Sequence, residues 1–252
     1  MTDADSTFSL PRFVEEVHAL KPSDGRARHE RLPDGRTTLV FRELDGGRGD
    51  VCVAGPRTHA LFKATPGVVR AVILQLRPGW SLPFLGVPAH TVTDRIIPLE
   101  DIWGRAGTEL CLQLLGAYTV REVVVRIAEA IARRIQDNFE PSSARLARRA
   151  TRLIEGGEMK MDAVAERLGV TARHLRRAFV ESVGVGPKDF ARSVRLRRAL
   201  KLARGAGAST NWGRIAVDAG YYDQAHLIAE FREMVGVTPG AYGRRRLAGA
   251  LA

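Results

Sequence analysis

The stretch DAGYYDQAHLIAEF, residues 218–231, has a counterpart upstream in ERLGVTARHLRRAF, residues 166–179. In both, a glycine is followed by a short variable stretch, then by His-Leu, and then by Phe four residues after the Leu. The matches before the turn lie 51 residues apart and those after it 52 apart, so the second copy has one extra residue in its turn. The matched pairs are Ala165/Ala216, Gly169/Gly220, Leu175/Leu227, Phe179/Phe231, Gly184/Gly236, Val185/Val237, Pro187/Pro239 and Phe190/Tyr242. So many ordered matches indicate two copies of one supersecondary unit.

Each copy has the pattern of a helix-turn-helix. A short helix ends at a glycine, which suits the left-handed position after a helix. Thr171 or Asp223 then caps a second helix through its side-chain oxygen. A Leu and a Phe four residues apart face inward on that second helix in both copies. Such a second helix commonly enters the major groove of DNA.

The outer face of the second helix differs between the copies. In the first, Arg173, Arg176 and Arg177 share one surface, and arginine suits bidentate contact with guanine. A merely solvated charged face is the alternative. The second copy has Ala225, Ile228 and Ala229 in their place, beside Gln224, which can pair with adenine while the alanines contact thymine methyl groups. We therefore expect unequal half-sites, with the first copy supplying most of the specificity.

The charge distribution supports a polyanionic partner. Residues 1–140 hold 18 Lys/Arg and 18 Asp/Glu, whereas residues 141–252 hold 21 and 10, so the whole net charge of +11 lies in the second part. Double-stranded DNA is the first candidate, and an anionic membrane surface or a well-solvated basic domain are the alternatives. No secretory signal and no membrane span is recognised. With only two cysteines, we expect a cytoplasmic protein with free thiols.

Between the two copies, residues 187–204 predict a helix of roughly 27 Å, set against about 34 Å for one turn of B-DNA. Such a connector can place two recognition helices in successive major grooves. Basic residues along it are expected to contact phosphates, which position a protein without specifying sequence. The predicted phosphate contacts are Thr171, His174, Lys188, Arg192, Arg195, His226 and Arg232, with Arg197 and Arg198 as further connector candidates.

The predicted fold class is α+β in two domains. Short β-favouring runs at 37–41, 51–55, 59–64 and 68–76 indicate a small antiparallel barrel or sandwich. A long helix is expected from Thr119, with Glu122 completing a capping box; its apolar stripe either packs in the core or pairs with a second subunit. The domains are predicted at 1–138 and 144–252, with a linker at 139–143. The second is all-α, with helices near 144–154, 162–168, 172–183, 187–204, 212–218, 224–235 and 240–246.

The tandem units, with GYYDQAHLIAEF, VGVTPGAY and the long joining helix, resemble the AraC/XylS transcription regulators over about 145–246. RLPDGRTTLVF, GPR and RPGWSLPFLGVP also resemble the sensor half of an actinobacterial-type subgroup. The resemblance implies a regulator, usually an activator working with RNA polymerase, whose N-terminal domain binds an effector, dimerises, or both. Carried over by position, its base-contacting sites fall on Arg173, Arg176, Arg177, Gln224, Ala225 and Ala229.

The N-terminal half carries weaker signals. Trp80, Phe84 and Trp103 are candidate walls of an effector pocket, with core packing as the alternative. His29, His59 and His90 lack the spacing of a metal site, and we expect no cofactor and no enzyme activity. A DNA-binding redox or alkylation sensor using Cys52 or Cys111 is the main alternative function, since it needs a reactive thiolate. A non-specific nucleoid protein is a third possibility, marked by salt-dependent binding without sequence preference.

Overall fold

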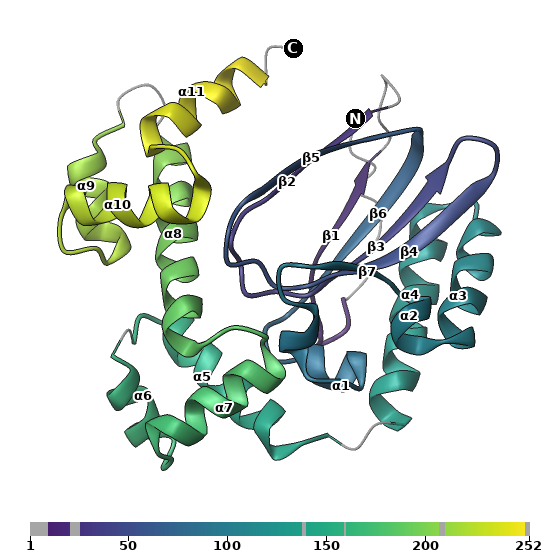
Figure 1. Ribbon diagram of the computed structural model, residues 1–252, viewed down its shortest axis with the longest axis horizontal. Helices are drawn as coiled ribbons and strands as arrows, with labels where there is room; N and C mark the ends of the chain where they lie inside the picture. Colours follow the sequence, from purple (N-terminus) through teal and green to yellow (C-terminus); the bar gives the residue numbers. More distant parts are fainter. Residues whose placement is uncertain (1–9, 21–25, 138–139, 159, 207–209, 250–252) are drawn as a thin grey trace.

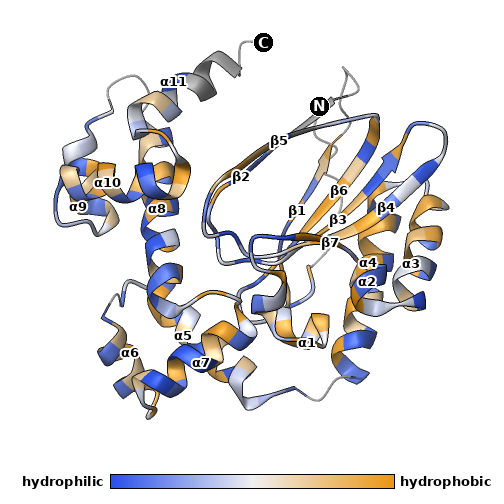
Figure 2. Cartoon of the chain, viewed as in Figure 1, coloured by the Kyte–Doolittle hydropathy of each residue, from blue (hydrophilic) through white to orange (hydrophobic). Residues whose placement is uncertain are grey.

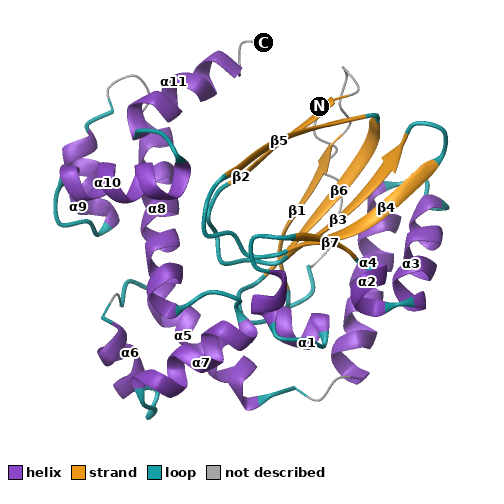
Figure 3. Cartoon of the chain, viewed as in Figure 1, coloured by secondary structure: helices purple, strands orange, loops and turns teal. Residues whose placement is uncertain are grey.

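Figure 1 shows the computed structural model, which describes residues 10–20, 26–137, 140–158, 160–206 and 210–249. The N-terminal part is built around an antiparallel sheet, and the C-terminal part is helical, as the sequence predicts. Figure 3 shows the strands confined to the first part of the chain. The structure therefore confirms the α+β class. No helix in the described ranges is long and apolar enough to cross a membrane.

The sheet domain has five strands in the order β1-β6-β3-β4-β7, and β2 pairs only with β5 in a separate two-stranded ribbon. Alternate residues of the central strands point into the core, where Leu39 lies opposite Leu74 and Phe41 opposite Val72. This alternation is the two-residue period of a half-buried strand. The strands are β1 Val14–Leu20, β2 Arg26–Arg31, β3 Thr38–Leu44, β4 Arg48–Ala54, β5 Leu61–Pro66, β6 Val68–Leu76 and β7 Ile96–Pro98.

Helices cover one face of this sheet, and Figure 2 shows hydrophobic residues gathered on the sheet and on the neighbouring α3 and α4. The stripe of α4, including Ile127 and Ile131, is buried in this core, so core packing is the correct alternative for it. The helix begins as expected: the Glu122 N–H donates to Thr119 Oγ1 at 3.1 Å, and its carboxylate accepts from the Tyr118 N–H at 2.8 Å. The elements are α1 Ser81–Leu85, the 3₁₀ turn η1 Ala89–Val92, α2 Glu100–Trp103, α3 Arg105–Leu115 and α4 Val120–Asp137.

The helical domain follows the predicted pattern closely. Its helices are α5 Ser142–Glu155, α6 Met161–Arg167, α7 Ala172–Ser182, α8 Pro187–Ala206, α9 Trp212–Ala219, α10 Gln224–Val235 and α11 Pro239–Gly249. The first helix-turn-helix, α6–α7, packs with α5 on the N-terminal half of α8. The second, α9–α10, packs on its C-terminal half. The predicted linker, residues 139–143, overlaps the start of α5 at Ser142 and Ser143, and its position 139 falls outside the described residues.

Four elements depart from the expected pattern. Strands β1, β2 and β7 were not expected, because VEEVHAL, RARHER and IIP are polar or too short to show a clear period. The helix α3 lies in the apolar run around Cys111, for which no helix bounds are predicted. These segments take their structure from pairing and packing with distant parts of the chain, which outweigh weak local preference.

Candidate DNA-binding surface

The first helix-turn-helix is built as its sequence predicts. Gly169 adopts a left-handed conformation with φ of +68°, and the Val170 N–H closes the end of α6 by donating to the Ala165 carbonyl at 3.0 Å. Thr171 is the N-cap of α7, because its hydroxyl accepts from the His174 N–H at 3.2 Å. This cap satisfies one of the backbone donors that a helix start leaves unpaired. The turn and the cap together fix the direction of α7.

The two faces of α7 separate as expected. Leu175 and Phe179 are buried in the core of the unit, while Arg173 and Arg176 are exposed. Within the described part of the chain, neither of these two arginines forms an ion pair. Arg177 is 82% exposed and pairs with Glu181 one turn further along, at 2.8 Å. An exposed pair of this kind contributes little stability, so Arg177 can exchange Glu181 for another anion.

The second unit repeats the construction with its longer turn. Gly220 is left-handed with φ of +91°, and Asp223 caps α10 by accepting from the His226 N–H at 2.7 Å. Three residues predicted to contact bases are exposed along α10, and they are Gln224, Ala225 and Ala229. None of them carries a charge. The two capped helices therefore present outer faces of different chemistry, one cationic and one nearly neutral.

Two predicted phosphate contacts have partners within the protein. Arg195 Nη2 lies 2.8 Å from Glu230 Oε1, and Arg192 contacts both Glu230, at 3.2 Å, and Glu233, at 2.5 Å. Their side chains are only 15% and 25% exposed. These arginines hold α10 against α8, a role missed in the sequence. Glu230 and Glu233, three residues apart on one face of α10, are the signal that could have indicated it.

The other predicted phosphate contacts are more accessible. Thr171, His174, Lys188 and Arg232 are exposed. His226 is partly exposed and lies 3.4 Å from Glu230. The connector arginines Arg197 and Arg198 contact Glu155 at the end of α5 instead: Arg197 lies 3.6 Å from its carboxylate, and Arg198 donates to its backbone carbonyl at 3.3 Å.

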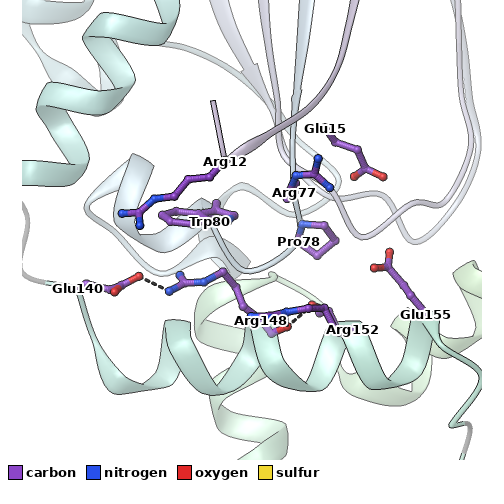
Figure 4. A pocket seen from close by; sticks show the side chains of 10 residues that line it. Arg12, Glu15, Arg77, Pro78, Trp80, Glu140, Arg148, Arg152 and Glu155 are labelled. Atoms are coloured by element: carbon purple, nitrogen blue, oxygen red, sulfur yellow. Dashed lines mark hydrogen bonds and ion pairs between the residues drawn. The ribbon is translucent and has the colours of Figure 1, made fainter. Parts of the chain in front are cut away.

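The three aromatic residues proposed for an effector pocket do not enclose one cavity. Phe84 and Trp103 pack edge to face in the core, with ring centroids 5.2 Å apart, and Trp103 Nε1 donates to the Phe84 carbonyl at 3.2 Å. Trp80 lies at the junction of the two domains between the guanidinium groups of Arg12 and Arg148, as Figure 4 shows. Phe84 and Trp103 therefore belong to the hydrophobic core, which was the alternative interpretation of these residues.

A cavity of about 620 Å³ lies away from these aromatic residues, between the sheet and the β2–β5 ribbon. The sheet lines it with apolar side chains, among them Val40 and Ile73, and with polar or charged ones, among them Thr38, Arg42 and Gln75. The connector helix α8 supplies part of its wall. The wall residues from α8 are Arg197, Leu200, Lys201 and Arg204, and those from the ribbon and its flanks include Glu30, Leu32, Leu61 and Lys63. This site has no signal in the sequence, because its walls come from both domains.

The cysteines do not have the properties of reactive thiols. Burial, together with the neighbouring Asp50, raises the pKa of Cys52 to about 11. Burial also raises the pKa of Cys111. Since the thiolate is the reactive form, both environments work against a redox or alkylation sensor. Among the described residues, no three His, Cys, Asp or Glu side chains gather in a way that could hold a metal ion; the His29 side chain lies outside them.

A buried ion network joins the domains. The Arg36 side chain is 3% exposed and contacts Glu15 of its own domain and Glu155 of α5, the latter at 3.0 Å. Burial alone would lower the pKa of Arg36, but Glu15, Glu155 and Asp34 raise it above its ordinary value. Glu155 also lies 3.6 Å from Arg197 on α8. The N-terminal domain is thus tied to the connector between the two units.

Comparison with known proteins agrees with this geometry. Residues 164–245 match a helix-turn-helix domain family. Residues 7–98 match a domain of unknown function. The chain is 37% identical over 83 residues to the HTH-type transcriptional regulator GlxA of Rhizobium meliloti, and 32% identical over 107 residues to the HTH-type transcriptional activator RhaS of Escherichia coli.

The C-terminal domain is of the AraC/XylS type. The two alignments cover 33% and 42% of this chain but only 25% and 38% of the relatives, so the likeness to them is one of the AraC/XylS domain. ToxT of Vibrio cholerae is similar over a larger part, with 92% of this chain and 98% of ToxT covered, at 10% identity and a TM-score of 0.47. A structure of ToxT bound to an unsaturated fatty acid aligns with a TM-score of 0.44.

Proposed function

We propose that this protein is a sequence-specific transcription regulator that recognises double-stranded DNA through α7 and α10. The observation that carries the proposal is the pair of capped helices whose outer faces are exposed, with Arg173 and Arg176 unpaired among the described residues. Unpaired arginines on a major-groove helix can form bidentate contacts with guanine O6 and N7. The net charge of the C-terminal part adds attraction to phosphates.

The two units are expected to contribute unequally. Arg173, Arg176 and Arg177 offer strong hydrogen-bond donors, whereas Gln224 is the one polar side chain among the three base-contact candidates of α10, beside Ala225 and Ala229. A good bidentate pair discriminates between bases by about 1–3 kcal/mol. The first unit therefore determines most of the sequence preference, and Arg176→Ala weakens specific binding more than Gln224→Ala.

Selection of bound sequences from a random DNA pool tests the function. The wild type should yield two unequal blocks about one helical turn apart. An Arg173/Arg176/Arg177→Ala triple variant should lose the stronger block. Arg105→Ala is the matched control, because this arginine is 92% exposed on the N-terminal domain and should leave selection unchanged. Salt-dependent binding without any enriched sequence would instead identify a non-specific nucleic-acid binder.

We further propose that the protein activates transcription with RNA polymerase, in line with the named activator among the relatives. A promoter bearing the selected sequence should then give more transcript when the protein is added to purified polymerase; a decrease would identify a repressor. The cavity of about 620 Å³ has the size of a small-molecule site, so we propose it as the effector site in place of the three aromatics. A homodimer would have to use a surface other than the buried stripe of α4.

A further inference from the structure

The two helix-turn-helix units are connected through a single helix. Phe190, Ala191 and Val194 of α8 belong to the core of the first unit. Leu196 and Leu200 belong to a separate core shared with α10 and α11. The hydrophobic cores of the two units thus meet α8 on successive halves and remain distinct. A bend in the middle of α8 would change the relative position of the two recognition helices without disturbing either core.

The N-terminal domain holds the first unit firmly. Besides the Arg36–Glu155 pair, Thr93 Oγ1 donates to the Gly184 carbonyl at 2.7 Å. Gly35 approaches the ring of Phe190 so closely that a Cβ at position 35 would lie 2.5 Å from Phe190 Cδ2. A close fit of this kind, backed by a buried ion pair, fixes the orientation of the first unit against the sheet domain.

The same domain also reaches the second unit, through a segment that we call the strap: the β2–β5 ribbon with the adjoining Leu32 and Ala60. The Ala60 N–H donates to the Met234 carbonyl at 2.7 Å, which pairs one of the carbonyls left open in the last turn of α10. Leu32 and Ala60 pack against the core of the second unit. The buried Tyr242 of α11 donates its hydroxyl to the carboxylate of Glu30.

These contacts leave the recognition surfaces free. Met234 and Tyr242 are at the C-terminal end of α10 and in α11, whereas the exposed Gln224 and Ala225 are at the start of α10. The first unit is likewise held away from its exposed arginines, at Gly184 and Glu155. Docking to the N-terminal domain is therefore compatible with DNA binding, and it restrains the distance and angle between the two units.

We infer that the strap determines which spacing between the two half-sites the protein accepts. Rigid attachment of both units to one domain resists bending at the middle of α8, so only one separation of the half-sites fits both helices. Each base pair inserted between them would rotate one half-site by roughly 34° about the duplex and shift it by roughly 3.4 Å. This inference rests on the proposed DNA recognition, whereas the physical hold of the strap on the second unit can be measured without DNA.

The test uses a strap variant and a matched control. Leu32→Ser with Ala60→Asp replaces the apolar contact and places a carboxylate beside the C-terminal end of α10, where negative charge is unfavourable. Phe62→Ser changes an exposed residue of the same ribbon (53% exposed) outside these contacts. Tyr242→Phe is a milder second variant, which removes the hydroxyl contact with Glu30 and keeps the ring packed edge to face against Phe231, with centroids 5.6 Å apart. Circular dichroism checks that each variant remains folded.

Spin labels report the hold directly. The labels are attached at two exposed positions, Glu166→Cys on α6 and Asp218→Cys on α9. Both substitutions are made in a Cys111→Ser background, in which the remaining native cysteine, Cys52, is buried. The distribution of label distances should be narrow in the wild type and in Phe62→Ser, and broader in the strap variant and in Tyr242→Phe. Equal widths in all four proteins would overturn the inference.

Spacing preference is measured on the selected sequence with one or two base pairs added or removed between its blocks. One base pair added or removed should lower the affinity of the wild type and of Phe62→Ser about tenfold. The affinity of the strap variant should fall only about threefold or less, because the geometric constraint between the half-sites is relaxed. Equal spacing penalties would overturn the assignment of spacing to the strap. A wild type that selects no sequence would refute the DNA-recognition function, and the label distances would still decide whether the strap holds the second unit.

Discussion

The ion pair between Arg36 and Glu155 offers a quantitative test of how the domains are joined. Arg36 Nη2 and Glu155 Oε1 lie 3.0 Å apart, a separation at which unit charges attract by about 5 kcal/mol at an effective dielectric constant of about 20. Two features reduce this figure. The Glu155 side chain is 34% exposed, and Arg36 keeps Glu15 and Asp34 as partners when Glu155 is changed. We therefore expect a coupling of about 1.5 kcal/mol, typical of a hydrogen bond to a charged group.

The assay is a double-mutant cycle with Arg36→Met, Glu155→Gln and the double variant. Urea unfolding of the full chain, followed by circular dichroism, gives the free energy of the first transition for each protein. Arg36→Met alone should cost about 3 kcal/mol, because it leaves Glu15 without its partner and Glu155 with only the more distant Arg197. Independent sites show a coupling energy below about 0.5 kcal/mol. A value in that range would refute the view that this pair joins the domains.

Three further predictions concern single sites. Thr171→Ala should destabilise the chain by about 1 kcal/mol through loss of the α7 cap, measured by urea unfolding, while Thr171→Ser should restore stability; equal stability of Ala and Ser would contradict the capping role. Gly184→Ala should lower the melting temperature, because φ there is +94° and the new Cβ would lie 2.8 Å from Pro56 Cγ and Thr93 Oγ1; an unchanged melting temperature would argue against this tight junction. Cys52, with a pKa about two units above its ordinary 9.0, should react with iodoacetamide at pH 8 about a hundredfold more slowly than a free thiol, because only the thiolate reacts; mass spectrometry measures the rate, and fast labelling would revive the thiol-sensor alternative.

The sequence predicted the helical domain well because each signal there is local. Gly169 and Gly220 end helices, Thr171 and Asp223 cap the next ones, and the repeat allows each copy to support the other. The exposed positions of α7 and α10 followed from helical periodicity alone. The prediction of base contacts at these positions remains to be tested by sequence selection.

Contacts across the domains could not be predicted in this way. Arg192 and Arg195 looked like phosphate contacts, and only the folded chain brings Glu230 and Glu233 to them. The aromatic residues suggested a pocket, but Phe84 and Trp103 fill the core, while the cavity formed where α8 crosses the strap. The ion pairs between α8 and α10 and the walls of the cavity leave no periodic or local signal in the sequence. Both depend on which surfaces meet after the chain has folded.

The strap residues Glu30 and Leu32 contribute to the wall of the large cavity and also contact the second unit. The two halves of this protein are therefore not exchangeable modules. A chimera that joins this N-terminal domain to the DNA-binding half of a relative would need matching partners for Glu30 and Leu32 on its last two helices. Likewise, engineering the cavity at these positions to accept a new compound would alter the choice of operator together with the choice of ligand.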